Sequence, residues 1–181
     1  MKKYILIASC LLVVNMISAQ KLLTRTGEVK FDASMPNLVE IAGKSNTVSA
    51  ILDESNGNFA ANCLVKSFKF KSPLMEEHYN ENYMESSKFP NSKFAGKVVG
   101  FSAAKLSDSK TSYELEGDFT LHGVTKKIKT KITLSQSGGK VIATGMFTVH
   151  AQDYAIEIPS LVKEKFAEQI KVSFNFELEG K

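Results

Sequence analysis

The sequence predicts an all-β protein, an antiparallel barrel of about eight strands with a helical insertion and a short C-terminal helix. Apolar and polar residues alternate with period two in several long segments, which is typical of antiparallel strands with one buried face. Turn-forming residues separate these segments. A closed barrel is favoured over an open sheet because it leaves no strand edge exposed. The 181 residues contain no internal repeat and no long linker, so we expect one folded domain.

The chain begins with the pattern of a secretory signal peptide, residues 1–19. Two lysines at positions 2 and 3 precede an apolar run over 4–14, and small residues follow up to Ala19. The run is too short to span a bilayer comfortably. We therefore expect cleavage after Ala19, which leaves a periplasmic or secreted barrel domain over 20–181.

Charge and cysteine content exclude several classes of protein. Without the two lysines of the signal peptide, the formal net charge falls from +4 to +2, which gives no support for nucleic-acid binding. Cys10 lies inside the apolar run of the signal peptide, so we do not expect it to carry a lipid anchor. Only Cys63 remains after cleavage, so we expect no internal disulfide and a fold that depends on its core.

The clearest alternation lies in the second half of the chain. Lysines at positions 127, 129 and 131 alternate with apolar residues, which predicts one dry and one wet face. Turns are predicted at Asn56-Gly57, at 107–110 and at 137–139. The residues expected to face the barrel interior are, segment by segment, Val124, Ile128, Ile132 and Leu134; Val141, Ala143, Gly145, Phe147 and Val149; and Ile170, Val172, Phe174, Phe176 and Leu178.

Two segments interrupt the strand pattern. Pro73 stands where the first position of a helix is expected, and apolar residues then recur at helical spacing. A second, short helix is predicted from about Pro159 to Gln169, because Leu161, Val162 and Phe166 would share one helical face.

The sequence contains no recognisable catalytic or metal-binding motif. His78, His122 and His150 lie on different predicted elements without a compact ligand spacing, so we expect no metal site. Neither a nucleophile elbow nor a glycine-rich phosphate loop occurs. Cys63 alternates with Ala61 in an apolar run and is expected to be a small buried residue. We therefore predict that the protein is not an enzyme.

Aromatic residues are concentrated on and beside the predicted strands. Each one alone is well explained by a packed core. A barrel of about eight strands, however, has an interior just wide enough either to fill with side chains or to hold one small ligand. Small inward residues such as Ala61, Ala143 and Gly145 would leave some free volume. Both a filled and a hollow barrel are compatible with the pattern.

Two motifs resemble the YceI-like family of exported lipid-binding proteins. Residues 117–126 (GDFTLHGVTK) are similar to the family's most specific signature, and 75–90 resembles its helix and the approach to the next strand. The aromatic residue expected on that strand is Phe94. The resemblance covers about 27–178. It weakens late in the barrel, where 149–155 (VHAQDYA) departs from the family's N-R-x-D-F/Y-G stretch.

The resemblance implies a lipocalin-like barrel that binds a long isoprenoid or a similar lipid, without catalysis or cofactor. Apolar walls would hold the chain, and polar residues at the mouth would orient a head group. For His122 a role as a turn residue before Gly123 is an equal possibility. The residues predicted to line the lipid cavity are Phe68, Phe70, Met75, His78, Tyr79, Tyr83, Phe94, Phe119, Leu121, His122, Phe147 and Phe174.

Two other functions stay open at this point. One is a filled barrel with a structural or partner-binding role at the cell envelope. The other, with the least support, is an exported hydrolase or isomerase that uses the histidines. The sequence indicates no oligomeric state.

Overall fold

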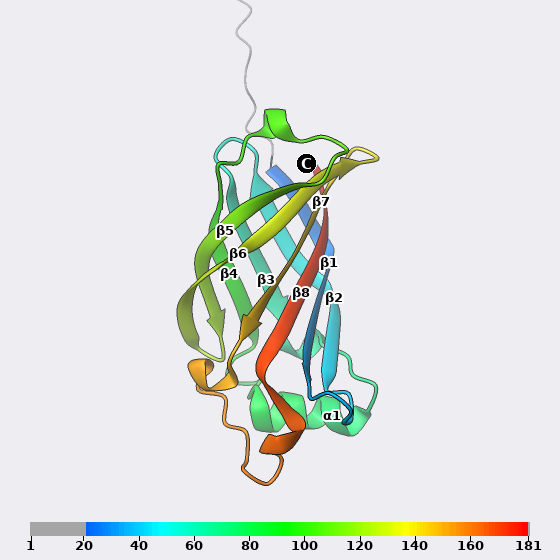
Figure 1. Cartoon of the computed structure of the whole chain (residues 1–181), viewed down its shortest axis with the longest axis vertical. Coiled ribbons are helices and arrows are strands. Elements are labelled where there is room, and N and C mark those ends of the chain that lie inside the picture. Colours follow the sequence, from blue (N-terminus) through cyan, green and yellow to red (C-terminus); the bar gives the residue numbers. More distant parts are fainter. Residues whose placement is uncertain (1–20, 181) are drawn as a thin grey trace, which may run out of the picture.

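Residues 21–180, the part described by the computed structural model, form a closed antiparallel barrel of eight strands (Figure 1). The strands are β1 (Lys21–Ser34), β2 (Ala42–Asp53), β3 (Asn58–Leu64), β4 (Asn91–Val99), β5 (Thr111–Leu121), β6 (Val124–Ser137), β7 (Lys140–Val149) and β8 (Phe166–Gly180). Each strand pairs with the next, and β8 pairs back with β1. The predicted barrel is confirmed. The predicted signal peptide lies outside the described residues.

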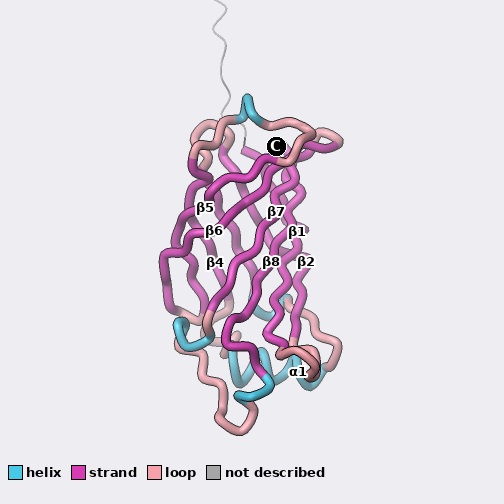
Figure 2. Tube along the Cα trace, in the orientation of Figure 1, coloured by secondary structure: helices cyan, strands magenta, loops and turns pink. Residues whose placement is uncertain are grey.

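Most of the helical segments gather at one end of the barrel (Figure 2). The β3–β4 connection begins with a 3-10 turn, η1 (Val65–Ser67), and then forms α1 (Pro73–His78), which confirms the predicted insertion. The helix continues as a π-helical turn, η2 (Tyr79–Tyr83), in which the backbone N–H of Met84 donates to the carbonyl of Tyr79 at 2.9 Å. The 3-10 turns η4 (Ala151–Tyr154) and η5 (Lys163–Lys165) lie at the same end, whereas η3 (Ala103–Lys105) lies at the opposite end (Figure 1).

The predicted helix over 159–169 is wrong. Only η5 forms in this segment, and β8 begins at Phe166, which pairs with Ser34 of β1. Leu161 is 91% exposed, so it does not share a buried face with Phe166. To close the barrel, β8 must form backbone hydrogen bonds with strands on both of its sides. This tertiary requirement overrides the local helical spacing.

The inward faces predicted for β6, β7 and β8 point into the barrel, but the interior has two different halves. Toward the strand ends opposite α1, the interior is a filled core. Large side chains from β2, β4, β6 and β8 are at most 1% exposed there: Leu52, Val98, Ile132, Leu134 and Leu178. In the half next to α1, the inward side chains leave a cavity between them.

Register shifts in β1 change which of its residues face inward. Leu22 and Thr24 are buried at even positions, whereas Gly27 and Ala33 are buried at odd positions. The pairing with β2 shifts on both sides of Gly27. An extra residue in a strand turns the following side chains to the opposite face. As a result, the second half of β1 presents Phe31 to the part of the barrel beneath α1.

The β6–β7 turn has the conformation that its glycines predict. Gly138 and Gly139 have φ of +57° and +78°, and they connect the directly paired residues Ser137 and Lys140. Positive φ at both central positions defines a type I′ turn, which matches the twist of the two strands.

The filled half should carry most of the stability of the barrel. Replacing Leu134 with alanine deletes a side chain that is 1% exposed, and it should lower the free energy of unfolding by about 2–5 kcal/mol. The matched control is Met146→Ala on the neighbouring strand, which is 60% exposed and should change it by less than about 0.5 kcal/mol. Urea unfolding measures both. If the two substitutions lowered the free energy of unfolding equally, the assignment of Leu134 to a filled core would be contradicted.

Candidate functional site

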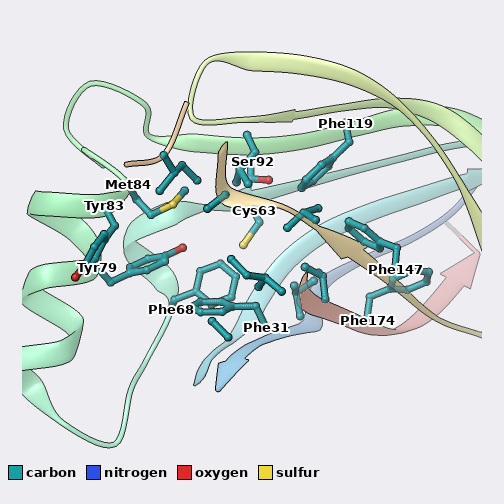
Figure 3. A pocket seen from close by; sticks show the side chains of 18 of the residues that line it. Phe31, Cys63, Phe68, Tyr79, Tyr83, Met84, Ser92, Phe119, Phe147 and Phe174 are labelled. Carbon is teal, nitrogen blue, oxygen red and sulfur yellow. The ribbon is translucent and has the colours of Figure 1, made fainter. Parts of the chain in front are cut away.

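A cavity of about 350 Å³ occupies the half of the barrel next to α1 (Figure 3). All eight strands contribute to its wall, and α1, η2 and the segment between β7 and β8 close its end. The size lies within the range of known ligand-binding sites. Its lining is almost entirely aromatic and aliphatic.

Eleven of the twelve residues predicted from the sequence line this cavity: Phe68, Phe70, Met75, His78, Tyr79, Tyr83, Phe94, Phe119, Leu121, Phe147 and Phe174. His122 is the exception. Of the small residues expected to create free volume, Ala61 lines the cavity, whereas Ala143 and Gly145 do not. Ala143 is fully buried in the filled half, and the ring of Phe174 lies against Gly145.

An aromatic cover closes the cavity on the side of α1; it consists of Phe31, Phe68, Phe70 and Tyr79. The ring centroids of Phe31 and Tyr79 are 5.4 Å apart and stacked, and those of Phe70 and Tyr79 are 4.9 Å apart. Two backbone hydrogen bonds of 2.8 and 3.0 Å between Lys69 and Lys44 attach the 68–70 segment to β2. The cover is therefore held both by ring packing, worth about 0.5–1.5 kcal/mol per pair, and by the sheet.

The opposite limit of the cavity is a phenylalanine floor formed by Phe59, Phe94, Phe174 and Phe176. Ring centroids are 6.1 Å apart for Phe59–Phe94 and Phe59–Phe176, and 5.2 Å apart for the stacked pair Phe174–Phe176. All four side chains are buried. They form a chain of contacts across the interior from β3 and β4 to β8.

Glycines make room for the floor. A Cβ atom at Gly96 or at Gly117 would lie 2.7 Å from Cζ of Phe94, closer than real Cβ contacts allow. Gly145 and Gly27 are covered in the same way by Phe174 and Phe176. Because these four positions have no side chain, the rings lie close to the backbone of neighbouring strands.

Few polar groups reach the cavity. Burial, together with the nearby thiol of Cys63, raises the pKa of the Tyr79 hydroxyl, so the phenol is neutral at physiological pH. Burial likewise raises the pKa of Cys63. Figure 3 shows the Tyr79 hydroxyl directed toward the interior and that of Tyr83 directed away. Tyr79 is thus available to donate one hydrogen bond to a ligand inside an apolar site.

The charged groups around the cavity are basic. Lys93 and Lys165 contribute to its lining, and no aspartate or glutamate of the described residues does. This set of groups can hold an apolar molecule by burial and can accept a polar end near the mouth. Within 21–180, no cluster of three or more His, Cys, Asp or Glu side chains is placed to hold a metal ion. None of the helices in this part of the chain is both long and apolar enough to cross a membrane.

The prediction that His122 lines the cavity is wrong. Its Nδ1 donates to the carbonyl of Tyr154 at 3.1 Å, and its Nε2 lies 3.0 Å from a carboxylate oxygen of Glu85. The ring packs edge-on against Phe89, with centroids 4.4 Å apart. With φ of +49°, His122 is the turn residue before Gly123. It ties the β5–β6 turn to the segment after η2 and to η4.

The sequence prediction missed several lining residues. Phe31 and Phe59 belong to the cover and the floor, and alternation in their strands (Val29, Phe31 and Ala33 in β1) is a signal that could have found Phe31. Ile156 and Val162 also line the cavity. No simple pattern predicts these two, because the segment that carries them is irregular.

Comparison with known proteins identifies a family and a fold. A family model described as the YceI-like domain matches residues 21–178. No curated protein shows a significant match. Among solved structures, a polyisoprenoid binding domain from Saccharophagus degradans, implicated in plant cell wall breakdown, aligns with a TM-score of 0.77 at 16% identity, covering 89% of this chain and 98% of that one.

Two other structures are similar. BcnA from Burkholderia cenocepacia aligns with a TM-score of 0.69 at 15% identity, over 84% of this chain and 94% of its own. The YceI protein of Campylobacter jejuni aligns with a TM-score of 0.56 at 13% identity, over 100% of this chain and 99% of its own. At these identities the structures show a shared fold.

His122 should matter for stability although it lies outside the cavity. The substitution His122→Ala removes the contacts of both ring nitrogens, with Tyr154 and with Glu85, and leaves the Tyr154 carbonyl without this donor. We therefore expect the free energy of unfolding to fall by about 2–3 kcal/mol. His78 is exposed, so His78→Ala should change the free energy of unfolding by less than about 0.5 kcal/mol. A thermal melt of both variants tests this. A His122→Ala variant that is as stable as the wild type would contradict the structural role of His122.

Proposed function

Since this chain belongs to the YceI-like domain family, we propose that it is a non-catalytic carrier that binds a long-chain isoprenoid or a similar lipid inside its barrel. The observation that carries the proposal is the apolar cavity between the aromatic cover and the phenylalanine floor. The polyisoprenoid binding domain of Saccharophagus degradans, which has the same fold, supports a ligand of this class.

Burial of hydrocarbon is sufficient to drive binding at such a site. Each buried methylene group contributes about 0.8 kcal/mol, without a charge or a metal ion. Part of this gain offsets the lost freedom of the ligand. The Tyr79 hydroxyl would orient an oxygen-bearing ligand, because it is a neutral donor directed into the cavity.

The alternative of a filled barrel with a structural or partner-binding role fits only half of the interior. The half around Leu134 is packed, but the half next to α1 holds the cavity. The geometry therefore favours the carrier. It offers the hydrolase hypothesis no support, because the histidines do not converge: His122 lies in a turn, and His78 is exposed at the cavity mouth.

A bulky residue in the cavity wall should expel the lipid. Ala61 lies on β3 with its side chain in the cavity lining, so the ring introduced by Ala61→Phe would occupy space that the ligand needs. We expect the wild type to retain a lipid, visible as added mass in a native mass spectrum, and the folded variant to lack it. A thermal melt checks that the variant is folded.

The same substitution in the filled half is the matched control. Ala143→Phe overpacks a fully buried position, so it should lower stability by about 1–3 kcal/mol while the lipid is retained. Wild-type protein that is lipid-free when purified from its native host, and that takes up no isoprenoid in vitro, would refute the carrier function.

We also propose that the carrier acts in the periplasm or outside the cell. The proposal rests on the charged, apolar and small residues of 1–19 in their order. The exported protein should begin at Gln20 and carry no acyl group on Cys10. Intact mass of material recovered from outside the cytoplasm measures this. A chain that begins at Cys10 with added acyl mass would contradict it.

A further inference from the structure

The wall of the barrel opens between β6 and β7, in the half that holds the cavity. The pairing of these two strands starts at their common turn and ends at Lys131 and Met146. Beyond this point, residues 124–130 remain paired with β5, and residues 147–149 remain paired with β8. The two strands therefore separate toward the end of the barrel that carries α1 (Figure 1).

A similar interruption between β2 and β3 is covered. The pairing of these strands ends at Ser49 and Asn62, and the 68–70 segment continues the wall, because Lys69 is paired with Lys44 of β2. Between β6 and β7, no isolated bridge and no backbone hydrogen bond of the described residues spans the gap. The β6–β7 opening is therefore the interruption that the backbone leaves uncovered.

Two side-chain contacts mark the ends of this opening, which we call the side portal. Where the pairing stops, the hydroxyl of Thr130 donates to the carbonyl of Met146 at 2.8 Å. At the other end, Nζ of Lys126 lies 2.7 Å from a carboxylate oxygen of Asp153 in η4. Both members of this ion pair are partly exposed, so the contact is weak and easily broken.

Inward side chains alone separate the cavity from the surface at the side portal. Ile128, Thr130 and Phe147 line both the cavity and a surface depression that also contacts outward side chains of β6 and β7. Farther along the same two strands, the inward Ile132 and Ala143 have no exposed surface. Ile128 and Phe147 are only partly buried. This difference in exposure is what an interruption of the wall produces.

The two ends of the cavity are more firmly closed than its side. The filled half closes one end, and the aromatic cover closes the other. In the cover, the Tyr79 ring packs against three other rings, and two backbone hydrogen bonds attach the 68–70 segment to β2. Among the described residues, Phe147 has one aromatic partner, Phe119, with centroids 5.3 Å apart. Rotation of the Phe147 ring therefore breaks fewer contacts than displacement of the cover.

We propose that an apolar ligand enters and leaves the cavity sideways, through the side portal, with Phe147 as its gate. Rotation of this ring away from Phe119 joins the cavity to the surface depression between β6 and β7. The inference rests on the proposed carrier function and adds to it the route that the lipid takes.

A removable crosslink across the side portal tests this route. If the β6–β7 pairing continued, Lys129 and Thr148 would stand directly opposite each other, and both side chains are exposed on the outer face. The Lys129→Cys/Thr148→Cys protein is joined by a flexible bismaleimide linker that contains a disulfide. Uptake and release of all-trans-retinol, a fluorescent isoprenoid alcohol, are then followed by stopped-flow fluorescence on delipidated protein.

The linked protein should exchange retinol slowly in both directions. We expect the rate constants of uptake and release each to fall at least about tenfold while the affinity changes by less than about twofold, because a blocked route slows both directions alike. Reduction of the linker should restore both rates.

The matched control places the same linker across paired strands. Glu116 and Lys129 are directly paired between β5 and β6, so linked Glu116→Cys/Lys129→Cys should exchange retinol at the rates of the wild type. Cys63 is buried, and burial raises its pKa, so it should not react with the maleimide. Intact mass verifies that one linker joins the two introduced cysteines.

Two phenylalanine substitutions compare the side portal with the aromatic cover. Phe147→Ala removes the gate ring and should raise the uptake rate by up to about tenfold, whereas loss of a lining contact alone would act mainly on release. Phe70→Ala removes a ring of the cover and should leave the uptake rate within about twofold of the wild type. If Phe147→Ala does not fold, the linked proteins still test the route.

The outcomes separate the side portal from the carrier function. Wild-type exchange rates in the linked Lys129→Cys/Thr148→Cys protein, or faster uptake in Phe70→Ala but not in folded Phe147→Ala, overturn the side portal while the carrier function stands. A folded, delipidated wild type that binds neither retinol nor a longer isoprenoid alcohol refutes the carrier function itself.

Discussion

The backbone pairing of β8 with β1 is the interaction on which the rest of the structure depends. It closes the sheet, so that the inward side chains are surrounded by strands around the whole circumference of the barrel. It draws Phe166 into a strand, although the local spacing there favours a helix. It also brings β8 between β1 and β7, where the rings of Phe174 and Phe176 meet the glycines of those strands. The pairing that closes the barrel therefore also positions the phenylalanine floor and, with it, one end of the cavity.

Leaving half of the interior unfilled has an energetic consequence. Side chains that line a cavity lack packing partners on one side and lose the dispersion contacts that a filled core provides. The packed side chains around Leu134 and the aromatic cover must compensate for this loss, and a bound chain would restore part of it.

The candidate site could be predicted to a large extent, because its residues lie on inward strand faces or on one helical insertion. Phe119 and Phe147 follow directly from period-two alternation. His122 was misplaced because a motif residue in a turn can point either to a ligand or to neighbouring loops, and its partners Glu85 and Tyr154 lie far away in sequence. The local alternation of Val29, Phe31 and Ala33 places Phe31 on an apolar face, but the register shift around Gly27, which turns that face inward, depends on the pairing with β2.

The sequence by itself determined the class of fold and the sides of the strands, since alternation and turn chemistry are local properties of the chain. Only the tertiary structure decided where the barrel is full and where it is hollow. Ala61 and Ala143 are the same residue on inward faces, yet Ala61 borders the cavity and Ala143 is fully enclosed. The difference comes from cross-strand neighbours: Ala143 pairs with Leu134 and Phe176. Free volume is set by side chains that meet only when the barrel closes.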